Sequence, residues 1–216
     1  MTDTATRTTP STLTTKTVDA LDASGIGLLV LRVGFGGLMA AYGTQKLFGW
    51  FNGQGLAATQ QGFDAMGYNP GALFGTLAGL TELIGGLLLV VGLFTPLAAA
   101  IVLGTMINAI NVLWSGGLFP ADPTVTGYST PLLFAIVAAV LAFTGPGAYS
   151  LDAGRPWARH GVVWGAAAVA LAVVTAVLTL ILKWALDNSL TSYLKGRRLV
   201  TRQGSGEPNP TWIPLA

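Results

Sequence analysis

An apolar stretch from Gly71 to Gly92 constrains this chain more than any other feature. About 20 apolar residues, rising 1.5 Å each, cross the roughly 30 Å hydrocarbon core of a bilayer. The one ionisable residue of this stretch, Glu82, lies near its middle. A carboxylate in hydrocarbon costs at least about 2.5 kcal/mol on insertion scales. We therefore expect Glu82 to be protonated or to face a partner on another helix.

Three glycines share a helix face with Glu82: Gly75, Gly79 and Gly86. Spacings of three and four residues place side chains on one face of a helix. Small residues let a neighbouring backbone approach closely in a membrane. The pattern predicts that these glycines are packing residues and that Glu82 points towards protein rather than lipid.

Composition supports an integral membrane protein. Of the 216 residues, 52% are hydrophobic and 9% are charged, whereas soluble domains carry roughly 25% charged residues. The net charge of +2 is too small to suggest nucleic-acid binding. Cysteine is absent, which excludes disulfides, thiol redox chemistry and cysteine-ligated metal clusters. The single histidine, His160, cannot give bis-histidine haem ligation, and no metal site is predicted.

The chain predicts an all-α membrane protein with five membrane helices. Their expected ranges are Gly25–Phe48, Gly71–Gly92, Leu97–Trp114, Thr130–Thr144 and Gly161–Leu186. The first four form a domain over residues 25–153, and residues 154–187 add a fifth helix with its basic connection. Residues 1–24 are expected to be a polar, Thr-rich, at most partly ordered tail, residues 188–216 a polar basic tail, and residues 51–70 a loop.

The distribution of basic residues predicts the orientation. Arg7 and Lys16 precede the first helix, and Arg155 and Arg159 lie in the fourth connection. Lysine and arginine concentrate on the cytoplasmic side of membrane proteins. We therefore expect the N-terminus in the cytoplasm, and five crossings then place the C-terminal tail outside. That tail is itself basic and runs against the rule, so either it is exported regardless or the fifth helix does not fully cross.

Four polar residues are expected at similar depths inside the membrane: Arg32, Glu82, Asn108 and Asn111. We predict an ion pair between Arg32 and Glu82, hydrogen-bonded by Asn108. It has two interpretations, a structural pair that fixes helix packing or a quinone or proton site. For the asparagines, interhelical hydrogen bonding is the favoured role.

The end of the first helix carries a second polar group: Tyr42, Gln45 and Lys46. Lysine near a helix end extends its ammonium to the interface, where aromatic residues also gather. We favour interfacial anchoring for Tyr42 and Lys46 over a chemical role.

Three motifs resemble the DoxX family of bacterial membrane proteins. They are Gly-x-Gln-Lys-Leu-Phe-Gly at 43–49, Glu-x-x-Gly-Gly at 82–86 and Gly-Pro-Gly-x-x-Ser-Leu-Asp at 145–152. The resemblance covers about Gly25 to Asp152 and implies a four-helix membrane bundle in the bacterial cytoplasmic membrane. Relatives include a subunit of a thiosulfate:quinone oxidoreductase, and others are proposed to act in oxidative-stress defence or electron transfer.

Some positions depart from the family pattern. Tyr42 stands where the family commonly has histidine, Ser129 where an acidic residue often opens the fourth helix, and Trp114 in a region that often holds histidine. If those titratable residues transfer protons or bind quinone in relatives, this chain has a reduced ability to do so.

Two functions remain open. We favour an accessory or anchoring subunit of a larger membrane complex, respiratory or redox, whose partners are other membrane subunits and lipids, with a homo-oligomer as an alternative. The second is a small quinone-binding or electron-transfer module, for which quinone is the cofactor. No nucleophile–base pair, phosphate loop or dinucleotide motif is present, so an autonomous enzyme is not predicted.

Overall fold

The computed structural model of the chain describes residues 12–204, with side chains over residues 23–189. These residues form six α-helices and one 3-10 turn. The helices are α1 (Thr12–Phe48), α2 (Gly55–Ala65), α3 (Gly71–Val91), α4 (Thr95–Leu113), α5 (Ser129–Thr144) and α6 (Val162–Gly204), and the turn η1 (Trp114–Gly116) follows α4. The described chain is therefore all-α, as expected.

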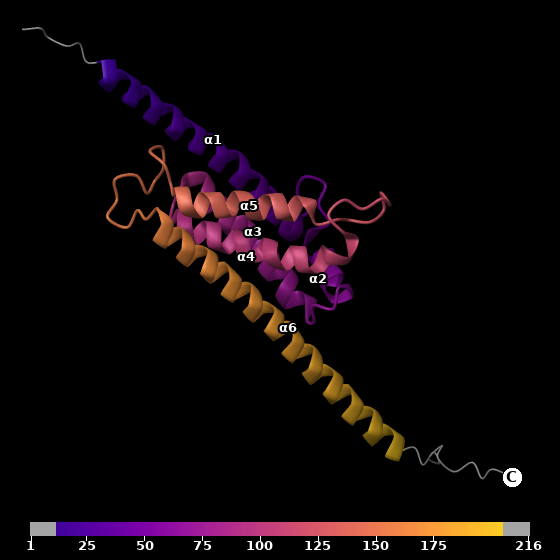
Figure 1. The fold of residues 1–216 in the computed structure, drawn as a ribbon. Coiled ribbons are helices and arrows are strands. Elements are labelled where there is room, and N and C mark those ends of the chain that lie inside the picture. The colour runs from indigo at the N-terminus through magenta and orange to yellow at the C-terminus, as the bar shows by residue number, and fades with distance from the viewer. Residues whose placement is uncertain (1–11, 205–216) are drawn as a thin grey trace, which may run out of the picture.

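Four helices are long and apolar enough to cross a membrane. Their spans are Ala23–Phe48, Gly71–Val91, Thr95–Gly116 and Val162–Ser189. The fourth expected membrane helix, Thr130–Thr144, corresponds to α5, which is apolar but has only 16 residues. It lies beside α4 in the bundle (Figure 1). The protein is thus a multi-pass membrane protein.

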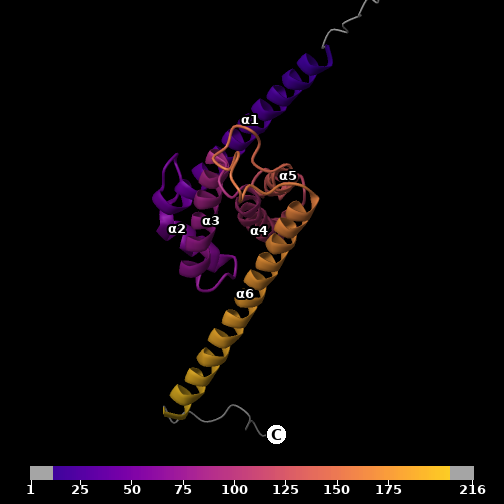
Figure 2. The same ribbon diagram turned by 90° about the vertical axis from the view of Figure 1, so that its left-hand side faces the viewer.

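Helix α4 is the centre of the bundle and packs against α3, α5 and α6. Helix α1 packs mainly against α3, and α2 lies along α3 on the side away from α5 (Figure 2). Large side chains that are fully buried in the core include Met39, Leu89, Val102 and Leu141. Alanines such as Ala98, Ala138 and Ala172 fill the remaining helix contacts. The core is therefore built from few large residues and many small ones, which lets the helices lie close together.

Glycines set the contact between α1 and α3. A Cβ atom added at Gly43 would lie 2.5 Å from the backbone nitrogen of Leu83, and one added at Gly36 would lie 2.6 Å from the carbonyl oxygen of Gly86. Such distances are shorter than any real Cβ contact, so only glycine fits. Because α1 and α3 run in opposite directions, these two contacts fix which residues lie level with each other.

Helix α2 corrects the sequence analysis, which expected a loop across residues 51–70. The eleven residues of α2 include none that is buried. It is tied to the start of α3, because the backbone N–H of Gly71 donates to Asp64 Oδ1 at 2.5 Å. A Cβ atom at Gly75 would lie 3.1 Å from the Cα atom of Gln60, so the first glycines of α3 pack on α2 rather than on α1.

Both outer helices are longer than expected. Helix α1 begins at Thr12 instead of Gly25, so part of the expected tail is helical, whereas residues 1–11 lie outside the described chain. Helix α6 continues to Gly204, about 64 Å at 1.5 Å per residue, and residues 205–216 are not described. The extensions of α1 and α6 leave the bundle at opposite ends (Figure 1).

Candidate functional site

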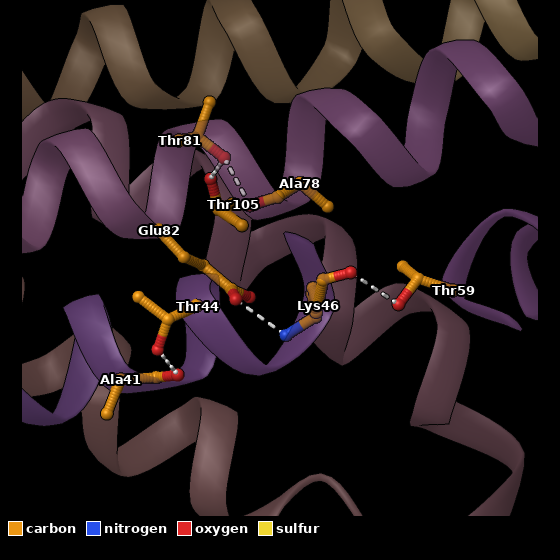
Figure 3. Close-up of polar contacts among 8 residues, drawn as sticks. All are labelled: Ala41, Thr44, Lys46, Thr59, Ala78, Thr81, Glu82 and Thr105. Carbon is orange, nitrogen blue, oxygen red and sulfur yellow. Dashed lines mark hydrogen bonds and ion pairs between the residues drawn. The ribbon is translucent and has the colours of Figure 1, made fainter. Parts of the chain in front are cut away.

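An ion pair inside the bundle joins α1 to α3. Lys46 Nζ donates to Glu82 Oε2 at 2.5 Å (Figure 3). The Glu82 side chain is 7% exposed and that of Lys46 is 28% exposed. Lys46 was expected to extend to the interface, and that prediction is wrong because its ammonium turns inward to the carboxylate.

Helix register explains this pairing. A Cβ atom at Gly79 would meet the side chain of Leu47, and one at Gly43 would meet Leu83. The first two turns of α3 therefore extend beyond the end of α1 and lie against α2. Glu82, one turn further along α3, lies level with the last turns of α1, where Lys46 is within reach.

Arg32 lies elsewhere in the bundle, so the expected pair between Arg32 and Glu82 is not formed. Arg32 is fully buried. It donates through Nη1 to the carbonyl oxygen of Leu89 at 3.3 Å and through Nη2 to that of Tyr149. Gly43 is level with Glu82, and Arg32 lies eleven residues before Gly43 on the same helix. This separation is about 16 Å along the helix axis. The expectation that Arg32 and Glu82 lie at similar depths is therefore wrong, because the first two turns of α3 extend beyond the end of α1.

A cavity of about 480 Å³ opens beside the ion pair. Helices α2, α3, α4 and α6 form its walls, and Lys46 of α1 lies at its edge. Its apolar lining residues include Phe63, Phe74, Leu77, Ile101, Val112 and Ala176. Few polar groups reach this space, so each one has a strong influence on what the cavity can bind.

Asn108 is one of these polar groups. Its Nδ2 atom donates to the carbonyl oxygen of Gly104 at 3.1 Å. Its Oδ1 atom is buried and has no hydrogen-bond partner within the described part of the chain. Buried polar atoms are nearly always satisfied, so this unpartnered oxygen on a cavity-lining residue is an exception. Asn111, expected on the same face, is exposed and does not line the cavity.

Two threonines add hydroxyl groups between α3 and α4. Thr105 Oγ1 donates to Thr81 Oγ1 at 2.9 Å, and Thr81 Oγ1 donates to the carbonyl oxygen of Ala78 at 3.0 Å (Figure 3). Both residues line the cavity beside Glu82. Their hydrogen bonds hold α3 and α4 together at this level.

Tyr68 lines the cavity from the α2–α3 connection. The residue is 2% exposed, and its ring makes edge contacts with Phe63 and Phe74. Its hydroxyl oxygen is buried without a hydrogen-bond partner among the described residues. Burial raises the pKa of Tyr68, so the hydroxyl stays protonated and able to donate. Lys183 Nζ of α6 lies 4.0 Å from the centroid of this ring, a cation–π distance.

The other residues of the first-helix motif shape the exit of α1. Gln45 Nε2 donates to the carbonyl oxygen of Phe51 at 3.1 Å. The Tyr42 ring packs edge-on against Phe134, and Lys46 Nζ lies 5.6 Å from its centroid. Neither residue lines the cavity.

Sequence reasoning selected Glu82, Lys46 and Asn108 but missed Tyr68, Thr81 and Thr105 at the cavity, and Lys183 over the Tyr68 ring. One signal pointed to Lys183: it is the first ionisable residue in the apolar run that begins at Val162. No pattern singled out Tyr68, because its surroundings come from α2, which was taken for a loop. The assembled cavity offers an ammonium and a phenol as donors, a carboxylate and an amide oxygen as acceptors, and apolar walls.

Comparison with known proteins agrees with these features. The DoxX family model matches residues 27–115, which run from within α1 into η1 and include Lys46, Glu82 and Asn108. Residues 116–152 were expected to share the resemblance and lie beyond that match, as do α5 and α6. No curated protein and no solved structure matches the chain. The apolar helices show a multi-pass membrane protein, and this match shows that it carries a DoxX domain over residues 27–115.

Proposed function

We propose that this protein binds a quinone-like amphiphile in the cavity beside Lys46 and Glu82. The observation that carries the proposal is the apolar cavity beside the ion pair, which Asn108 also lines; the Oδ1 atom of Asn108 is buried and lacks a partner among the described residues. A ligand with an apolar body and ring oxygens would satisfy this atom without exposing hydrocarbon to water.

The cavity suits such a ligand in size and polarity. Its volume of about 480 Å³ lies in the range of small-molecule sites, which are mostly apolar with a few placed polar groups. The Lys46 ammonium and the Tyr68 hydroxyl can donate to a carbonyl oxygen, and Asn108 Oδ1 can accept from a hydroxyl group. Both redox forms of a quinone therefore have complementary groups here.

The ion pair gives the site a place to hold a proton. A bound quinone supplies electron and proton transfer chemistry. In this chain, Lys46 Nζ and Glu82 Oε2 share a hydrogen bond of 2.5 Å. A carboxylate and an ammonium in this contact can hold a proton on either atom, and Lys46 is the more exposed partner.

A second proposed function, an accessory or anchoring subunit of a larger membrane complex, is favoured by α6. This helix runs 15 residues beyond the membrane span that ends at Ser189. An isolated helix of that length is marginal in water, so a partner subunit of a respiratory or redox complex would stabilise it. The two proposals are compatible, because a quinone-binding module can belong to such a complex.

The test compares quinone bound to the wild-type chain and to two matched variants. Asn108→Leu removes the unpartnered oxygen, whereas Asn111→Leu makes the same change at an exposed position on the same helix. Each protein is purified from its native membrane in mild detergent, and quinone is measured by mass spectrometry of the extracted lipid.

We expect enriched quinone in the wild type and in Asn111→Leu, and loss in Asn108→Leu and in Glu82→Gln. Thermal unfolding of each variant distinguishes loss of binding from loss of fold. Quinone at the level of the bulk lipid in wild-type protein would refute the quinone proposal. A stoichiometric membrane protein co-purifying with such a quinone-free sample would support the subunit proposal instead.

A further inference from the structure

A second groove lies nearer the N-terminal ends of α4 and α6 than the cavity does. Its volume is about 260 Å³. Its apolar walls include Phe94, Leu97, Trp157, Trp164, Ala167 and Leu171. Phe94, Leu97, Trp157, Trp164 and Leu171 are each between 41% and 47% exposed. The groove therefore runs along the outside of the bundle, where membrane lipid is the surrounding medium.

Arg159 lines this groove, and Arg155 stacks on Trp157 of its wall. The guanidinium of Arg159 lies 4.9 Å from the centroid of Trp164, and that of Arg155 lies 5.3 Å from the centroid of Trp157. An arginine stacked on an aromatic face keeps its N–H groups in the guanidinium plane, free to bind a phosphate. Neither guanidinium makes a hydrogen bond or ion pair within residues 23–189, whose side chains are described.

The acidic residue nearest this groove in sequence is already engaged. Asp152 is 1% exposed. Its Oδ2 atom accepts from the backbone N–H of Thr95 at 3.1 Å, and its Oδ1 atom accepts from Trp157 Nε1 at 3.1 Å. Asp152 is also the one acidic residue between positions 145 and 186. The carboxylate thus holds the Trp157 wall in place and leaves the two arginines as the charges beside the groove.

We propose that this groove binds an anionic phospholipid, with its phosphate at Arg155 and Arg159 and one acyl chain between α4 and α6. Charge complementarity identifies the head group, since basic pockets between membrane helices bind anionic lipid head groups. The tryptophans mark the level of the membrane interface. The groove volume equals that of about nine water molecules, enough for the upper part of one chain.

The position of the groove fits the lipid distribution of a membrane. Arg155 and Arg159 are among the residues that predict the cytoplasmic side of the protein. The cytoplasmic leaflet carries anionic lipids that attract basic residues. Each arginine near the surface then contributes roughly five-fold to the affinity for an anionic head group.

The test is native mass spectrometry of the full chain in detergent with added phosphatidylglycerol or phosphatidylcholine. Arg155→Gln/Arg159→Gln removes the two charges of the groove. Arg197→Gln/Arg198→Gln removes the same amount of charge from the C-terminal segment. This variant tests whether any pair of basic residues is enough to bind the anionic lipid. Ala167→Trp fills the groove without changing the charge, and Ala170→Trp makes the same change on an exposed part of α6 outside the groove lining.

We expect phosphatidylglycerol to bind more tightly than phosphatidylcholine. Arg155→Gln/Arg159→Gln should weaken the binding of phosphatidylglycerol by about 25-fold. Ala167→Trp should abolish lipid binding in the groove. The Arg197/Arg198 and Ala170 variants should bind as the wild type does. Equal binding of the two lipids, loss on changing Arg197 and Arg198, or unchanged binding in Ala167→Trp would each overturn the proposal. Circular dichroism of each variant confirms that its helices are intact.

Discussion

Arg32 shows how one buried charge can hold two distant parts of the chain together. Its guanidinium donates to the carbonyl oxygens of Leu89 in α3 and Tyr149 in the α5–α6 connection. Replacement by methionine keeps the length of the side chain but leaves both carbonyls without this donor. We expect Arg32→Met to lower the free energy of unfolding by about 3 kcal/mol, measured as a lower thermal midpoint in detergent.

Arg32→Lys is the informative companion variant. A lysine ammonium is a point charge and lacks the planar fork that reaches two acceptors at once. It should therefore restore only part of the lost stability. Full recovery by lysine would mean that the charge alone matters and that the two-carbonyl contact does not.

The Lys46–Glu82 pair predicts non-additive behaviour. Removing one partner of a buried ion pair costs about 3–5 kcal/mol, whereas replacing both by apolar residues is often nearly neutral. Lys46→Met should be the more damaging single change, because the carboxylate that it leaves is the more buried partner. Thermal midpoints of Lys46→Met, Glu82→Leu and the double variant measure this. If the double variant lost as much stability as the two single variants together, the result would contradict the pairing.

At the scale of elements, glycines determine how α1 meets α3. A Cβ atom at Gly43 would lie 2.5 Å from the backbone of Leu83, whereas one at Gly37 would meet nothing within 4 Å. We expect Gly43→Ala to separate the two helices and to weaken the Lys46–Glu82 contact, with a loss of about 1–3 kcal/mol. Gly37→Ala should be neutral or slightly stabilising. Thermal unfolding of the two variants tests this, and equal effects would refute it.

Helix positions were largely predictable from the sequence, because long apolar runs ended by glycine or proline are strong signals. Gly71–Gly92 was expected and α3 spans Gly71–Val91. Helix α2 was not predicted, since it is rich in glycine and glutamine and buries no residue. The hydrogen bond from the backbone N–H of Gly71 to Asp64 ties the start of α3 to α2.

The candidate site was predicted only in part, and the reason is register. The sequence identified Glu82 as a buried charge that needs a partner, and the structure gives it one. Which cation lies level with it depends on where α3 starts relative to the end of α1, and no pattern within either helix contains that information. Because this register was unknown, the sequence led us to pair Glu82 with Arg32 instead of Lys46.

At the scale of the whole molecule, α6 continues to Gly204, 15 residues beyond the membrane span that ends at Ser189. We expect a chain ended after Ser189 to keep the thermal midpoint of the full chain. If the protein is a subunit of a larger complex, the same truncation should release it from its partners, seen as a smaller species on native gels. A lower midpoint would show instead that the extension stabilises the bundle itself.

The length of the α6 span has a further consequence. Its 28 residues from Val162 to Ser189 measure about 42 Å, against a hydrocarbon core of about 30 Å. A span longer than the core adapts by tilting, and α6 crosses the bundle obliquely (Figure 1). Because Thr175, Ala176 and Thr179 of this helix form one wall of the cavity, bilayer thickness becomes a variable of the site. A thicker membrane would draw α6 upright and change the width of the space in which a ligand is held.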